Sequence, residues 1–93
     1  MHDFQYGVEY PFDGLVEGVS LERTDAIDEL LWAMDMREQL AAREDYQTSW
    51  FDNARVVIRE GYSEADEWGP WALSDVTPEE ITERGRELYG EVD

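Results

Sequence analysis

The chain has 93 residues, of which 42% are hydrophobic and 13% aromatic, and its 24 acidic and 7 basic residues leave a formal net charge of -17. Because it has no cysteine it is not a disulfide scaffold, and its aromatic content is too high for a typical acidic disordered tail. The charge disfavours direct binding to nucleic acid or to an anionic membrane surface, since both would repel the chain. The length is that of a single domain, residues 1–93.

The first segment predicts a β-hairpin. Apolar residues alternate with polar ones, the pattern of a half-buried strand. The residues expected on the apolar face are Phe4, Tyr6, Val8 and Tyr10. Asp13 and Gly14 form a dipeptide that favours a tight turn, and residues 15–19 then predict the returning strand.

Residues 24–43 predict the central helix. Thr24 is a suitable N-cap, and Asp25 lies in the first turn, where a carboxylate favours the helix dipole. The residues of the expected apolar stripe are Ala26, Ile27, Leu30, Ala33, Met34, Leu40 and Ala41. Trp32 lies to one side of this stripe.

The second half of the chain predicts one strand and one helix. Residues 44–53 favour a loop, and residues 54–60 are rich in the β-branched residues typical of strands. A turn and an acidic loop are expected over 63–67. A helix is expected over 78–90, with Thr77 as N-cap, Pro78 at its first position and Glu80 completing a capping box.

These elements predict an α+β fold of order β-β-α-β-α. The N-terminal hairpin and strand 54–60 form a small antiparallel sheet, helix 24–43 covers it, and helix 78–90 packs at one edge or extends outward. Strand alternation places Val56 and Ile58 in the core and puts Arg55, Val57 and Arg59 on the other face. The C-terminal helix is one possible cover for Val57.

Two groups of side chains are candidates for binding a partner. Asp28, Asp35 and Glu38 are expected to point away from the apolar stripe of the helix as exposed, weakly coupled charges. Trp50 and Trp71 fall in predicted loops, where they either cap the ends of the core or act as exposed anchors.

The sequence predicts no catalytic site, cofactor or metal site. The only histidine is His2, near a terminus, and neither a nucleophile motif nor a glycine-rich phosphate loop is present. The acidic groups at 25–29 and 64–67 lack the spacing of an EF-hand loop. No apolar run is long enough to span a membrane and the N-terminus does not resemble a signal peptide, so a cytoplasmic location is expected.

The chain resembles small acidic accessory proteins of bacteriophages that infect actinobacteria. The resemblance is carried by residues 6–8, the turn at 13–14, the helix from Thr24 and residues 54–60, together with the arginine-only basic set. It implies a protein in the host cytoplasm that binds and redirects a host protein. Haloarchaeal small proteins share this composition.

The functional hypothesis is therefore a non-enzymatic acidic protein that binds and inhibits or redirects a host protein with a basic surface, with mimicry of nucleic acid as one form of that binding. Two alternatives stay open. One is an interaction module that recognises a host protein unrelated to DNA binding through aromatic anchors. The other is a salt-adapted domain of unrelated function. The oligomeric state is not predicted.

Overall fold

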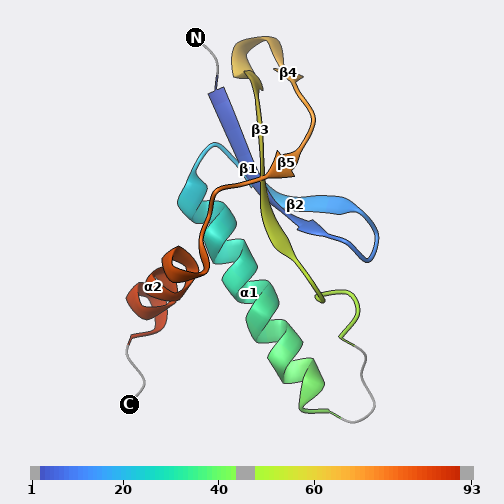
Figure 1. Cartoon of the computed structure of the whole chain (residues 1–93), viewed down its shortest axis with the longest axis vertical. Coiled ribbons are helices and arrows are strands. Elements are labelled where there is room, and N and C mark those ends of the chain that lie inside the picture. Colours follow the sequence, from blue (N-terminus) through green and yellow to red (C-terminus); the bar gives the residue numbers. More distant parts are fainter. Residues whose placement is uncertain (1–2, 44–47, 91–93) are drawn as a thin grey trace.

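The computed structural model describes residues 3–43 and 48–90, and it confirms the α+β fold class (Figure 1). The elements in chain order are β1 (Asp3–Tyr10), β2 (Leu15–Ser20), α1 (Arg23–Ala41), β3 (Arg55–Tyr62), the short 3-10 helix η1 (Ser63–Ala65), β4 (Glu67–Trp68), β5 (Ala72–Leu73) and α2 (Pro78–Tyr89). No helix within these described ranges is long and apolar enough to cross a membrane.

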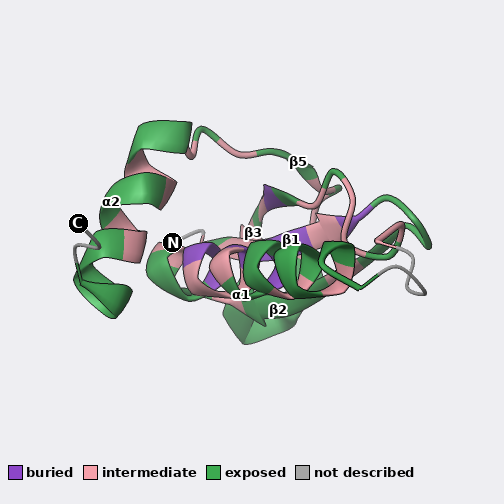
Figure 2. Cartoon of the chain, turned by 90° about the horizontal axis from the view of Figure 1, so that it is seen from below, coloured by how far each residue is buried: buried purple, intermediate pink, exposed green. Residues whose placement is uncertain are grey.

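The strands form one antiparallel sheet of order β2-β1-β3-β4, with β5 also paired to β3. The predicted hairpin and the predicted third strand are its centre. The sequence did not predict β4 and β5, because two-residue strands are too short to show an alternating pattern. Helix α1 lies against one face of the sheet, and α2 packs against α1 (Figures 1 and 2).

The core lies between α1 and the β1–β3 pair. Val8 is paired with Val56 across the two strands, and both are buried against Ala26, Leu30 and Ala33 of α1. Figure 2 shows the buried residues along these three elements and none on α2. The prediction for Val56 is confirmed.

Two details of the predicted β3 packing are corrected. Ile58 is only half-buried: its β1 partner, Tyr6, is half-buried as well, and the buried core begins at the next pair on the same face, Val8 and Val56. Val57 lies on the arginine face as predicted and is buried. Its predicted cover was wrong, because α2 packs against α1 on the other side of the sheet.

A β-bulge in β2 helps to cover the sheet face opposite α1, which we call the second sheet face. The register with β1 shifts opposite Gly7, and Gly18 takes a left-handed conformation with φ 64°. The extra residue places Val16 and Val19 together over Gly7, where a Cβ would collide with the Val16 side chain. The bulge therefore brings apolar side chains to the strand position next to Val57.

Helix α1 differs from the prediction at both ends, since it covers Arg23–Ala41, whereas α2 starts at the predicted residue. Helix α1 begins one residue earlier than predicted, with Glu22 and not Thr24 at the N-cap position. In α2 the Thr77 hydroxyl accepts a hydrogen bond from the Glu80 backbone N–H at 3.2 Å, as predicted. The Glu80 carboxylate does not complete a capping box and binds Arg23 instead.

Gly85 faces α1 without being required there. A Cβ at this position would meet the Leu31 side chain at 3.5 Å, an ordinary contact, and its backbone is helical. Because glycine costs about 1 kcal/mol relative to alanine in a helix interior, Gly85→Ala should raise the melting temperature. Thermal unfolding followed by circular dichroism checks this, and a lower melting temperature would show that α1 and α2 need the glycine.

Candidate protein-binding surface

Five aromatic side chains from three separate segments meet at the hairpin end of the molecule. Tyr10 and Phe12 come from the hairpin, Trp32 from α1, and Trp50 and Phe51 from the segment before β3. The ring centroids of successive neighbours lie 5.5–6.5 Å apart, within the range of favourable aromatic pairs. We call these five residues the aromatic cluster.

The aromatic cluster has a buried base and an exposed top. Tyr10 is 1% exposed, and its hydroxyl donates a hydrogen bond to the Glu29 carboxylate at 3.2 Å. Burial, and then the charge of Glu29, raise the pKa of the Tyr10 hydroxyl well above its usual range. Above this base, Phe12, Trp32 and Trp50 are 60%, 48% and 43% exposed.

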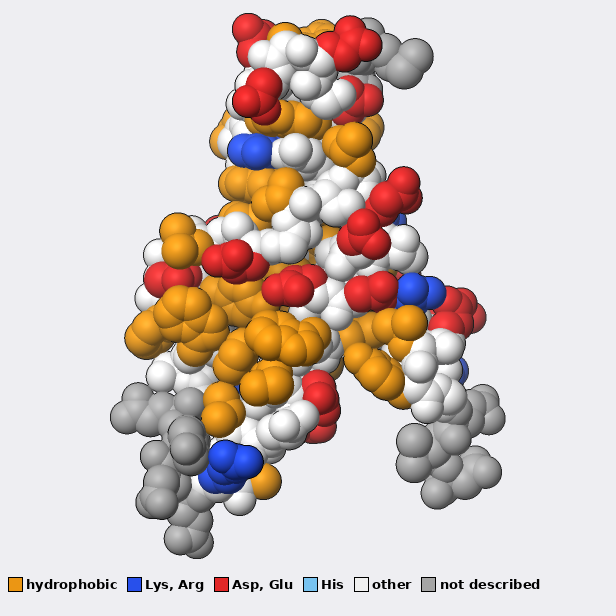
Figure 3. Space-filling view, turned by 180° about the vertical axis from the view of Figure 1, so that it is seen from behind, with side chains coloured by type: hydrophobic (Ala, Val, Ile, Leu, Met, Phe, Trp, Pro, Cys, Tyr) orange, Lys and Arg blue, Asp and Glu red, His pale blue; other side chains and the backbone are white. Residues whose placement is uncertain are grey.

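The exposed rings belong to a larger apolar surface. Figure 3 shows hydrophobic side chains gathered over the hairpin and the adjoining end of α1, with acidic side chains beside them. Large exposed apolar patches on a soluble protein often mark interaction sites, and tryptophan is enriched among interface hot spots. Of the two predicted anchors, Trp50 therefore lies in a suitable place.

Carboxylates surround the aromatic cluster. Glu29 contacts Tyr10 directly, Asp13 follows Phe12 in the hairpin turn, and Asp35 lies three residues beyond Trp32, on the neighbouring turn of α1. Asp52 follows Phe51 and is paired with Arg37, whose Nε lies 2.6 Å from its carboxylate. Arg37 holds the pKa of the Asp52 carboxyl below its usual range.

The three predicted acidic residues of α1 have different surroundings. Asp35 and Glu38 are exposed, and Asp35 accepts a hydrogen bond from the Gln39 amide at 2.8 Å. Asp28 is half-buried and accepts two hydrogen bonds from Arg84 of α2, at 2.7 and 3.0 Å. The expectation that Asp28 is a free surface charge was wrong, because α2 carries an arginine to it.

The Trp71 ring is also in contact with another side chain of this protein. The Arg59 guanidinium lies 4.4 Å from the Trp71 ring centroid and 5.4 Å from that of Trp68, and its Nε donates to the Gln5 side chain. Trp71 is thus half-buried on the second sheet face and packs on this arginine. It lies apart from Trp50, so the two predicted anchors do not form one site.

The structure adds Phe12 and Trp32 to the candidate surface. A signal for Trp32 was present in the sequence, because it lies to the side of the apolar stripe of its helix. Phe12 gave no such signal, since nothing in a turn sequence shows which side chain faces a distant loop.

Two arginines fasten α2 to the rest of the protein. Arg23 at the start of α1 binds Glu80 through two hydrogen bonds and Asp75 through a third, at 2.6–3.0 Å. Arg84 makes the paired bonds to Asp28. Bidentate pairs of this kind are strong and directional. Because α2 has no buried residue, these ion pairs take a large share of its attachment.

The attachment of α2 should be lost in acid. Hydrogen bonds from Arg84 to Asp28, and from Arg23 to Asp75 and Glu80, lower the pKa of each carboxyl. A lowered pKa in the folded state adds stability above the unfolded value of about 4, and this is lost as pH falls through the lower folded value. Free helices as short as α2 are marginal in water, so far-UV circular dichroism should lose helical signal below about pH 4.

A matched variant separates this effect from general acid unfolding. Asp28→Asn with Glu80→Gln should already lack part of the helical signal near neutral pH, while the tryptophan fluorescence of the aromatic cluster stays unchanged. A variant with the full helical signal would show that the ion pairs do not hold α2.

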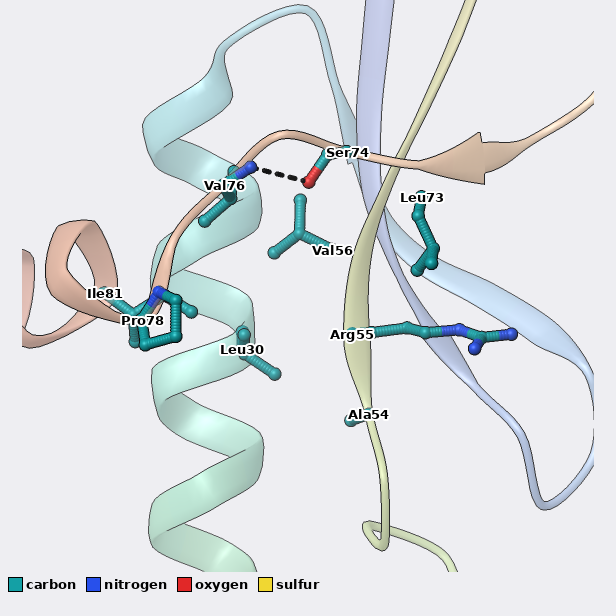
Figure 4. A pocket seen from close by; sticks show the side chains of 9 residues that line it. All are labelled: Leu30, Ala54, Arg55, Val56, Leu73, Ser74, Val76, Pro78 and Ile81. Atoms are coloured by element: carbon teal, nitrogen blue, oxygen red, sulfur yellow. Dashed lines mark hydrogen bonds between the residues drawn. The ribbon is translucent and has the colours of Figure 1, made fainter.

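A small apolar groove lies where α2 meets the sheet. Its volume is about 220 Å³, and Figure 4 shows Leu30, Val56, Val76 and Ile81 directed into it from four segments. The Ser74 hydroxyl is engaged by the Val76 N–H at 3.3 Å. The groove offers shape and apolar surface, and it can receive an apolar group.

Comparisons with known proteins give this surface no precedent. No family model, curated protein or solved structure matches the chain. Over residues 3–43 and 48–90, no group of three or more acidic or histidine side chains is placed to hold a metal ion. The function must therefore be argued from the charge and the aromatic cluster.

Proposed function

We propose that this protein is a non-enzymatic binding protein for a basic surface on another protein. The observation that supports this most directly is the exposed aromatic cluster surrounded by carboxylates, on a chain with a net charge of -17. Long-range attraction speeds the encounter with a basic surface, and buried aromatic anchors slow dissociation.

The net charge of -17 already counts the seven arginines, so it is the charge that a distant partner meets. Within the residues that the structure describes, at least four arginines form ion pairs with carboxylates, and Arg59 is stacked on Trp68 and Trp71. The arginines in ion pairs are Arg23, Arg37, Arg55 and Arg84. Carboxylates such as Asp35 and Glu38 are exposed and add to the external field.

Mimicry of duplex DNA is one form that this binding can take. The Cα atoms extend 47 Å along the longest axis, so the chain carries one net charge per roughly 3 Å, against one per about 1.7 Å of duplex. This is a weaker field than that of DNA. The aromatic cluster supplies apolar contacts that phosphates cannot, and it favours the broader proposal of a basic protein partner.

The resemblance to phage accessory proteins adds a more specific proposal. It names a host protein as the partner and its inhibition or redirection as the result. The interaction module with aromatic anchors remains the second candidate, and the exposed Trp32 and Trp50 favour it.

The proposal is tested by immobilising the protein and capturing partners from a bacterial lysate treated with nuclease. The captured proteins should be basic and should be released by salt. For a partner identified in this way, Asp35→Lys with Glu38→Lys should slow association and weaken its dependence on salt, while circular dichroism stays unchanged. Asp28 is excluded from this variant because it binds Arg84. Capture of acidic proteins only would refute the proposal.

A further inference from the structure

We infer that the aromatic cluster is the contact surface and that it receives an arginine side chain of the partner, with the guanidinium on the exposed rings and its charge facing the surrounding carboxylates. This inference rests on the proposed function and names the partner chemistry that fits. It is argued from the exposure of the rings, the charge around them and the way this chain already holds its own arginines.

The rings are exposed on a firm support. Trp50 contacts both Tyr10 and Phe12, and Trp32 packs edge-on against Phe51. Tyr10 is buried in the core and tied to α1 through Glu29. The rings are therefore held in place before a partner arrives, so less conformational entropy is lost on binding.

The charge around the rings selects a cationic occupant. Glu29 is bonded to Tyr10, Asp13 is adjacent to Phe12 in the hairpin turn and Asp35 lies one helical turn from Trp32, so a positive group over the rings is near negative charge. A second copy of the chain would bring its own net charge of -17 to the same place, which opposes self-association. An apolar partner without basic residues would leave these carboxylates without compensation.

The chain already binds arginine in this way at two places. Arg59 lies over Trp71 and Trp68 and donates to Gln5. Arg23 lies 5.9 Å from the Tyr6 ring centroid while it binds Glu80 and Asp75. The aromatic cluster resembles the Arg23 site in having a ring and carboxylates, and it resembles the Arg59 site in having tryptophan rings, but its rings are exposed. A flat guanidinium stacks on such rings better than the compact ammonium of lysine.

The test uses two synthetic peptides, nona-arginine and nona-lysine, added to the ¹⁵N-labelled protein. The four tryptophans provide an internal comparison, since Trp32 and Trp50 lie in the cluster while Trp68 and Trp71 are packed on Arg59. Nona-arginine should shift the indole signals of Trp32 and Trp50 and leave the other pair unchanged. It should also bind about threefold or more tightly than nona-lysine.

Substitutions in the aromatic cluster test whether its rings produce the preference for nona-arginine over nona-lysine. Trp32→Leu with Trp50→Leu should remove the preference for arginine while weaker, salt-sensitive binding of both peptides remains. Tyr62→Leu is the matched control, because Tyr62 is 51% exposed at the far end of β3 and should leave the preference intact. If the double variant loses its dispersed amide spectrum, Phe12→Leu at the hairpin turn tests the same surface.

The outcomes separate the two proposals. Shifts at Trp68 and Trp71 alone, or binding without any indole shift, overturn the inference and leave the proposed function standing. Shifts at Trp32 and Trp50 with equal affinity for both peptides overturn the choice of arginine. Failure of both peptides to bind at low salt overturns the proposed function and the inference together.

Discussion

Val8→Asp should abolish the cooperative folding of this protein. Val8 is fully buried in β1, beside Val56 and against the buried face of α1. An aspartate there would lose the apolar contacts and place a carboxylate where no cation reaches it, at a cost of several kcal/mol. Small domains are stable by only about 5–15 kcal/mol in total.

The shape and the small core predict a low free energy of unfolding for this protein. Its Cα radius of gyration is 14.6 Å, against about 12 Å for a compact chain of this length, and its thinnest dimension is 17 Å. Within residues 3–43 and 48–90, eight hydrophobic side chains are buried, and several of them are small: Val8, Tyr10, Ala26, Ile27, Leu30, Ala33, Val56 and Val57. The free-energy cost of one buried charge should therefore exceed the free energy of unfolding of this protein.

The measurement is the amide NMR spectrum with thermal unfolding followed by circular dichroism. Val19→Asp is the control, because Val19 lies on the same hairpin and is 44% exposed, so it should keep a folded spectrum. Ile58→Asp should fall between the two, since Ile58 is half-buried. A cooperative, unchanged transition in Val8→Asp would contradict the core described here.

The melting temperature should rise steeply with salt. The Debye length falls from about 30 Å at 0.01 M to about 8 Å at 0.15 M ionic strength. The first length reaches across much of a molecule 47 Å long, and the second reaches only neighbouring charges. Self-repulsion from the net charge of -17 is therefore felt across the fold at low salt and only locally at physiological salt.

The acidic tip near η1 allows a matched control. Glu64, Asp66 and Glu67 are exposed, and Asp66 has a φ of 51°, which asparagine also tolerates. Replacing them with Gln, Asn and Gln should raise the melting temperature at low salt and flatten its salt dependence. A melting temperature that is flat or falls between these salt concentrations would show that repulsion does not limit stability.

Local pattern predicted most of the elements. The alternation of β1, the turn at Asp13 and Gly14, the β-branched run of β3 and the Thr77 cap each depend on neighbouring residues, so they can be read from short windows. The bulge at Gly18 and the strands β4 and β5 were missed, because each is set by pairing with another strand and is too short to show a repeating pattern of its own.

The candidate surface was predicted only in part. Asp35 and Glu38 are exposed as expected, and Trp50, for which the sequence left two roles open, is 43% exposed. Asp28 and Trp71 are engaged by Arg84 and Arg59, from segments that are 56 and 12 residues away. Composition shows that seven arginines face 24 carboxylates, but it does not show which carboxylates they reach.

The sequence by itself determined the order of the main elements, the direction of Val8, Tyr10 and Val56 into the core and the excess of negative charge, because these follow from residue type and local spacing. Only the tertiary structure decided which charges and rings a partner can meet. The chain offers each long arginine side chain many carboxylates and aromatic rings, and distance in the folded structure decides which of them it contacts. The fold alone sets that proximity, since it brings α2 to Asp28, Trp71 to Arg59 and five rings from three segments into one cluster.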